Sequence, residues 1–334
     1  MSYYVVQGLA QAIYETCGNF LTLNIWSNIS ESPLNVVHAG YGVGALLSIQ
    51  LARPFIKFTS QQQEFQNSTI TQTIDLTAPY WSCSLFSFLV GFLFVLSQLV
   101  ESDTHKHNTN WSAKYRQLKE TTNAKRKLSI LSLFLLVCLF IQGYLTTISR
   151  FMLTYLTRGP PQLTLSQFSL VQTFFWLFFI LGRFAYGLIG YFKLKNCRQN
   201  SFFFLVLLFL NLIISVVMVV SEFVSVAIDW YWWMLVISLL GLISGPLTPG
   251  IIMLAKQVMA SSFNMSTLSM FVACNGLGSI AFQQVTGSLL DLKYQWMKST
   301  FVLPYVAMVA TFFSFVFFLI IYLIFTEFKS EVKQ

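Results

Sequence analysis

The sequence predicts an all-α, polytopic membrane protein with about nine transmembrane helices. Of its 334 residues, 55% are hydrophobic and 10% are charged, whereas a soluble domain carries about 25% charged residues. The mean hydropathy is +0.65. The apolar residues form runs of about 20, the length that a helix needs to cross a bilayer. These runs cover residues 2–25, 33–56, 79–100, 128–148, 165–192, 200–221, 229–254, 263–289 and 299–325.

Basic residues lie mainly between these runs, and they set the predicted orientation. The segment 101–127 is rich in Lys and Arg, as cytoplasmic loops of membrane proteins are. Placing it inside puts the C-terminus inside and the N-terminus outside. The chain then divides into residues 1–100 with three spans, a central cytoplasmic loop 101–127, and a six-helix half 128–334 with a short cytoplasmic tail. The net charge of +8 is therefore interpreted as cytoplasmic anchoring, and no nucleic-acid partner is expected.

The first span, 2–25, carries a row of polar residues. Gln7, Gln11, Glu15 and Asn19 recur every four residues, which keeps them on one face of a helix. Such a row is costly in a membrane unless it faces protein or a water-filled cavity. We expect it to line a path for a polar solute, with a structural polar seam between helices as the alternative.

The second span, 33–56, is rich in glycine. Gly40 and Gly44 form a G-x-x-x-G pattern, which predicts a close contact with another helix. His38 precedes them and is expected to be a hydrogen-bonding residue or a proton relay. In the fifth span, Arg183 lies near the inner end and is expected to snorkel or to cap a helix end.

The seventh span, 229–254, contains Pro246, Pro249 and Gly250. These residues predict a break or kink near the middle of the membrane. Broken helices in transporters line the substrate path or absorb the rocking motion, although a plain kink is an equal alternative. Acidic residues at the outer ends of spans are expected to be solvated; they are Glu222, Asp229 and Asp291.

Short motifs restrict the class of protein further. The sequon Asn67-Ser68-Thr69 falls in a predicted outside loop, where N-glycosylation is expected; this fits the secretory route and the plasma membrane. The five cysteines have no metal-ligand spacing and are expected to be free thiols, so no metal site is predicted. No hydrolase, metalloprotease or nucleotide-binding motif is present, so neither an enzyme nor a cofactor is expected.

Three segments resemble a known family. They are Gly8-Leu9-Ala10 followed by Tyr14-Glu15-Thr16-Cys17-Gly18-Asn19-Phe20, then Asn35 to Gln50 ending in Ala52-Arg53-Pro54-Phe55, and Phe175-Trp176 followed by Leu181-Gly182-Arg183-Phe184. They are similar to helices four, five and eight of the major facilitator superfamily, in the branch of fucose–proton symporters and sodium-dependent glucose transporters. The resemblance implies a 6+6 helical fold that is incomplete here, lacking the first three spans.

The same resemblance implies roles for residues of the first two spans. Glu15 matches the acidic residue that contributes to sugar binding and ion coupling, Asn19 matches the family's helix-four Asn, and His38 matches the polar residue of helix five. Tyr41 stands where some members carry a second amide. Burial favours a protonated Glu15, whereas bound sodium favours the charged form. A protonated Glu15 that only bonds a neighbouring helix is the structural alternative.

A sugar also needs amide partners and an aromatic face. The second half offers these groups in Gln142, Gln172, Trp176, Asn275 and Gln283. The sequence therefore predicts a secondary transporter of a small polar solute, with a hexose as the expected substrate, coupled to Na⁺ or H⁺ by alternating access. The alternative is a truncated or non-transporting membrane protein, such as an isoform, a receptor-like relative or an interaction partner.

Overall fold

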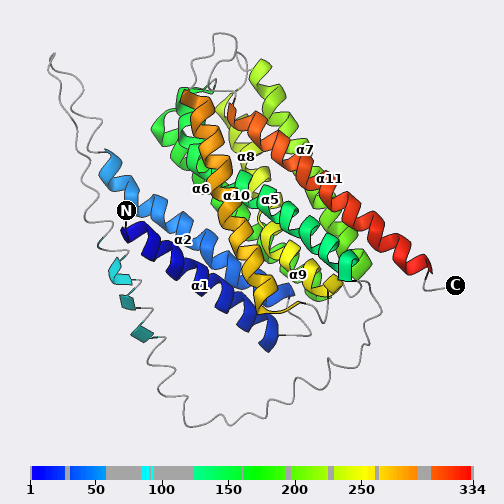
Figure 1. The fold of residues 1–334 in the computed structure, drawn as a ribbon. Coiled ribbons are helices and arrows are strands. Elements are labelled where there is room, and N and C mark those ends of the chain that lie inside the picture. The colour runs from blue at the N-terminus through cyan, green and yellow to red at the C-terminus, as the bar shows by residue number, and fades with distance from the viewer. Residues whose placement is uncertain are drawn as a thin grey trace, which may run out of the picture. The chain divides into compact units, whose positions relative to one another are not determined.

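The structure, a computed structural model, describes most of the chain outside residues 58–123 and only a few residues within that stretch. In the described residues every regular element is a helix and none is a strand (Figure 1). The chain divides into two compact units, Met1–Val43 with Thr121–Gln334, and Gly44–Glu120. The described residues are 2–26, 31–57, 81, 84–86, 88–89, 92–93, 124–159, 161–192, 197–224, 229–259, 263–291 and 302–331.

The second half of the chain contains six stretches that are long and apolar enough to cross a membrane, and the chain is therefore a multi-pass membrane protein. This confirms the last six predicted spans as helices. α8 and α9 together make one of these crossings. The helices are α5 Ala124–Arg158, α6 Leu165–Phe192, α7 Cys197–Phe223, α8 Trp230–Ser244, α9 Leu247–Met259, α10 Met265–Asp291 and α11 Val302–Glu331.

Helix α5 is longer than the predicted span 128–148 at both ends. Its first residues, 124–127, belong to the helix and not to the predicted loop 101–127. At the other end, hydroxyl groups of Thr146, Thr147 and Ser149 donate to carbonyl oxygens three or four residues earlier. Because these hydroxyls bond within the helix, the polar run continues it instead of ending it.

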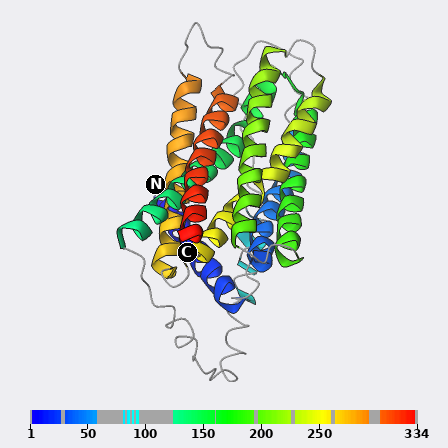
Figure 2. The same ribbon diagram turned by 90° about the vertical axis from the view of Figure 1, so that its right-hand side faces the viewer.

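The six spans form two groups of three, the first made of α5, α6 and α7 and the second of α8–α9, α10 and α11. The first span of each group packs against helices of the other group. In the first group, α5 packs against α10 and α11 of the second group. In the second group, α8 packs against α6 and α7, and α9 also packs against α7. The two third helices, α7 and α11, contact each other (Figure 2). The first crossing of each group therefore lies against the other group.

Glycines allow the closest of these contacts. A Cβ atom on Gly278 of α10 would meet the carbonyl oxygen of Leu139 in α5, and one on Gly143 of α5 would meet the ring of Phe282. Small residues at such positions let two helix backbones approach. The α6–α8 contact is of the same kind: the carbonyl oxygens of Leu242, Phe175 and Phe179 lie opposite Gly182, Gly241 and Gly245.

Helices α1 (Ser2–Ile25) and α2 (Glu31–Lys57) lie where the first two spans were predicted; that they cross the membrane stays a prediction. α1 packs against α10. The first part of α2 meets α6 through Gly42, where a Cβ atom would lie 2.7 Å from Ile180. Among the described residues nothing lies within 4 Å of a Cβ atom on Gly40, so the predicted contact there stays a prediction. The close contact is made by Gly42, two residues further along α2.

The unit Gly44–Glu120 contains the second part of α2 and a few residues of the third predicted span, 79–100. The rings of Phe88 and Phe92 stack there with centroids 6.4 Å apart. The sequon at Asn67 and residues 101–123 of the predicted loop lie outside the described residues.

Candidate functional site

The break between α8 and α9 confirms the predicted effect of the prolines. α8 ends at Ser244 and α9 begins at Leu247. In a continuous helix the carbonyl of Gly245 would accept a hydrogen bond from the N–H of residue 249. Residue 249 is proline and has no N–H, so the Gly245 carbonyl must find another donor.

Arg183 of α6 supplies that donor. Its Nε donates to the Gly245 carbonyl at 2.8 Å, and its Nη1 donates to the backbone carbonyl of His38 in α2. The guanidinium carbon lies 4.2 Å from the centre of the Phe179 ring. Only 3% of Arg183 is exposed. The prediction that this arginine snorkels is therefore wrong, because two interior carbonyls and an aromatic face hold it inside the bundle. The alternative, that it caps a helix end, is confirmed, because Gly245 is the C-cap residue of α8.

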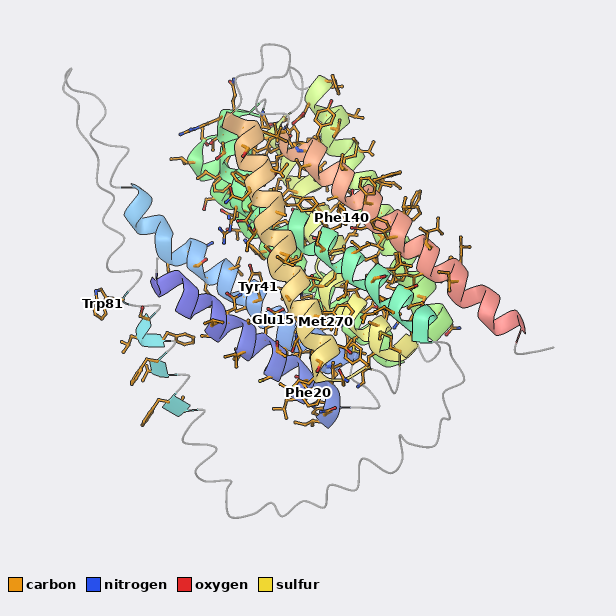
Figure 3. The ribbon with its side chains drawn as sticks, viewed as in Figure 1. Glu15, Phe20, Tyr41, Trp81, Phe140 and Met270 are labelled. Carbon is orange, nitrogen blue, oxygen red and sulfur yellow. The ribbon has the colours of Figure 1, made fainter. Side chains whose placement is uncertain are left out.

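Glu15 lies beside this arginine. It is half-buried on α1, and its carboxylate accepts a hydrogen bond from the side chain of Asn275 in α10. Arg183 is near enough to act on its charge. The Oδ1 atom of Asn275 also accepts a bond of 2.8 Å from the Cys138 thiol of α5. Figure 3 labels Glu15 on α1.

Asn19 and His38 join α1 to α2 next to these groups. His38 Nε2 and Asn19 Oδ1 are 3.0 Å apart. Asn19 is 3% exposed, and its amide nitrogen has no acceptor among the described residues. A buried amide donor without an acceptor is available to a ligand. We call Glu15, Asn19, His38, Arg183 and Asn275 the Glu15 cluster.

An aromatic pair lies on the same two helices as His38 and Arg183. The rings of Tyr41 in α2 and Trp176 in α6 meet edge to face, with centroids 5.8 Å apart at 68°. Trp176 is buried, whereas Tyr41 (labelled in Figure 3) is exposed. Such rings offer an apolar face beside the polar cluster.

The remaining predicted residues are less closely joined. Gln142 accepts a bond of 3.2 Å from Thr248, just after the helix break. Gln172 and Gln283 are half-buried, and neither forms a hydrogen bond with the Glu15 cluster. Gln11 of the four-spaced row is exposed, and the side chain of Gln7 lies outside the described residues.

The arrangement therefore combines a carboxylate, amides, an imidazole and a guanidinium from four helices. No family model matches the chain, and a search of curated proteins finds no match. Arg183 is the member of the cluster that sequence reasoning missed. The signal was Pro249, four residues after Gly245, because it predicts a carbonyl that a distant side chain must satisfy.

A second basic residue attaches α1 to the bundle. Lys256 of α9 donates from Nζ to the carbonyl of Leu23 at 2.7 Å. Leu23 lies in the last turn of α1, where carbonyls have no partner within the helix. Like Arg183, this lysine meets a backbone oxygen of the first two helices and not a carboxylate.

One acidic residue also differs from its prediction. Glu222, expected to be solvated at the outer end of a span, is 3% exposed. It lies in the last turn of α7, facing the neighbouring helices, because the last turn of a helix has a buried side as well as an open one.

Proposed function

We propose that this chain is a secondary transporter that carries a small polar solute across a membrane by alternating access. The observation that supports this most directly is the position of Glu15. Its carboxylate lies between α1 and the six-helix bundle, bonded to Asn275 and beside Arg183. Ionisable residues inside a membrane protein mark substrate and ion paths more often than they serve packing.

The packing of the six spans supports the same class. Transporters of the major facilitator type contain inverted three-helix repeats within each half. Here the first helix of each three-span group packs against the other group. Both contacts, α5 with α10 and α8 with α6, place glycines against backbone or ring atoms. α5 makes the first of the six crossings and α8 begins the fourth. Because successive crossings alternate in direction, these two helices run in opposite directions through the membrane. This arrangement favours the proposed relation to that superfamily.

The groups of the cluster suit a sugar as the solute. Glu15 and the free amide nitrogen of Asn19 supply an acceptor and a donor for neighbouring hydroxyl groups. Trp176 and Tyr41 supply an aromatic face for the C–H surface of a hexose. A hexose therefore remains the proposed substrate, and the plasma membrane the proposed location, with Asn67 as the proposed glycosylation site.

Glu15 is also the proposed coupling residue. Its carboxylate binds a proton or Na⁺ in one orientation and returns to Asn275 and Arg183 in the other. A coupling role requires that removing the negative charge abolishes the response to the ion gradient but not all movement of solute.

The test is uptake of labelled hexoses into proteoliposomes under imposed Na⁺ or H⁺ gradients, with the parent chain, Glu15→Gln and Asp229→Asn. Asp229 is an exposed acid just before α8, so its variant controls for loss of any carboxylate. We expect the parent and Asp229→Asn to accumulate hexose. Glu15→Gln should exchange labelled for unlabelled hexose without accumulating it.

Each other result has a distinct meaning. Equal accumulation by Glu15→Gln and the parent would remove Glu15 from coupling. If the parent moves no hexose under either gradient while folded in the vesicles, the hexose transporter proposal fails and a non-transporting membrane protein is favoured.

A further inference from the structure

A second buried acid lies at the end of the bundle that the predicted orientation places outside, on a different helix from Glu15. Glu222 of α7 is 3% exposed, and Tyr155 of α5 is also 3% exposed. The Glu222 carboxylate and the Tyr155 hydroxyl face each other. All three of their oxygen atoms are buried, and no other described group bonds to them.

The surrounding side chains hold this pair in place. The Tyr155 ring meets the buried ring of Trp233 in α8 edge to face, with centroids 5.7 Å apart. Beside Glu222, the hydroxyl of Ser221 accepts a bond of 2.9 Å from Trp232 Nε1, which fastens the end of α7 to the start of α8. Three helices therefore converge on the carboxylate.

No described cation neutralises Glu222. The charged residues of the same three helix ends are Arg150 and Arg158 on α5 and Asp229 before α8, and all three are exposed. None of them forms an ion pair with Glu222 in the described chain. A buried carboxylate without a counter-charge is strongly unfavourable, and a bound proton removes that charge.

We propose that Glu222 and Tyr155 form a proton-binding site at the outer end of the bundle, separate from the Glu15 cluster. The site offers three oxygen atoms, too few to replace the hydration shell of Na⁺, whereas a proton needs only one. With the proton bound, the Glu222 carboxyl donates to the Tyr155 oxygen. When the proton leaves to the outer solution, the Tyr155 hydroxyl donates to the carboxylate. The pair is therefore satisfied in both states after a small side-chain movement.

The experiment is infrared difference spectroscopy of the full-length protein in lipid, stepped through pH in H₂O and D₂O, which follows the carbonyl stretch of protonated carboxyl groups. This readout needs no substrate and does not depend on transport. The variants are Glu222→Gln, Tyr155→Phe and, as the matched control, Glu15→Gln. Glu222→Gln keeps the shape of the protonated side chain, so it should fold.

We expect one deuterium-sensitive carboxyl band to disappear in Glu222→Gln and to persist in Glu15→Gln. Tyr155→Phe should keep the band but move its frequency and the midpoint of its titration, because the hydrogen-bond partner is gone. A band unchanged in Glu222→Gln, or one that is lost on adding Na⁺ at fixed pH, would overturn the proposal. If Tyr155→Phe leaves both frequency and midpoint unchanged, the tyrosine is not part of the site.

Discussion

The two basic side chains that reach α1 and α2 do so through backbone oxygens. Arg183 donates to the carbonyls of Gly245 and His38, and Lys256 donates to the carbonyl of Leu23. Hydrogen bonds to charged donors are stronger than those between neutral groups. The planar fork of arginine allows one side chain to serve two carbonyls and stack on a ring at the same time.

Arg183→Lys should therefore destabilise the protein although the charge is kept. A lysine cannot satisfy both carbonyls and the Phe179 face, and losing one hydrogen bond from a charged group costs about 1.5–3 kcal/mol. We expect a lower melting temperature in detergent, with Arg150→Lys, an exposed position on α5, as the control. Equal melting temperatures for the two variants would show that the interior contacts of Arg183 are not significant.

For single residues, the sequence predicted the kind of polar side chain in the bundle better than the partner that each side chain contacts. The structure joins Asn19 of the first predicted span to His38 of the second by a hydrogen bond and places Glu15 one turn before Asn19. That these residues bind a solute stays a prediction. The expectations that Arg183 snorkels and that Glu222 is solvated were wrong, since nearness to a span end does not tell which way a side chain points. Only the partner helices decide that.

Among the elements, the broken helix α8–α9 depends on a neighbour for its stability. The carbonyl of Gly245 lacks a backbone donor because of Pro249, and α6 provides a side-chain donor in its place. The break was predictable from Pro246 and Pro249. The helix that would stabilise it was not, because that requires the packing of α6 against α8.

This dependence predicts coupling between residues 183 and 249. Pro249→Ala supplies an N–H that can donate to Gly245, so Arg183→Lys should cost less in that background. The expected coupling free energy is about 1 kcal/mol, within the range for residues that share a partner. Thermal melting of the parent, both single variants and the double variant measures it. Additive effects would show that the backbone does not take over from Arg183.

Two glycines of α10 test the close contact between α5 and α10. Gly278→Ala should lower the melting temperature, because the added Cβ meets the Leu139 carbonyl and overpacking costs about 1–3 kcal/mol. Gly276→Ala, two residues away, has open space around it. It should raise stability by about 0.5–1 kcal/mol, as alanine favours a helix over glycine. The same sign for both variants would contradict the close approach.

For the whole molecule, hydropathy predicted the six spans of the second half and placed α1 and α2 correctly as helices. It could not predict that the first helix of each three-span group packs against the other group. That arrangement depends on glycines such as Gly143 and Gly278, which are distant in sequence. The orientation in the membrane follows from Lys and Arg alone and stays a prediction.

Thiol labelling tests that orientation. Gln162, in the connection between α5 and α6, is exposed and should face outside, whereas Gln334 should face inside. In a background with Cys17→Ser, which removes an exposed thiol, a membrane-impermeant maleimide should label Gln162→Cys in intact cells. Gln334→Cys should react only after permeabilisation. The reverse pattern would invert the topology.

The carbonyl contacts of Arg183 and Lys256 have one further consequence. A contact between an ammonium or guanidinium group and a peptide oxygen contains no group that gains a proton when the surroundings become acidic. The hydrogen bonds from Arg183 to α2 and from Lys256 to α1 should therefore survive acidification, for instance inside an acidic organelle. Sensitivity to acid in this protein would then reside in its carboxylates and its three histidines.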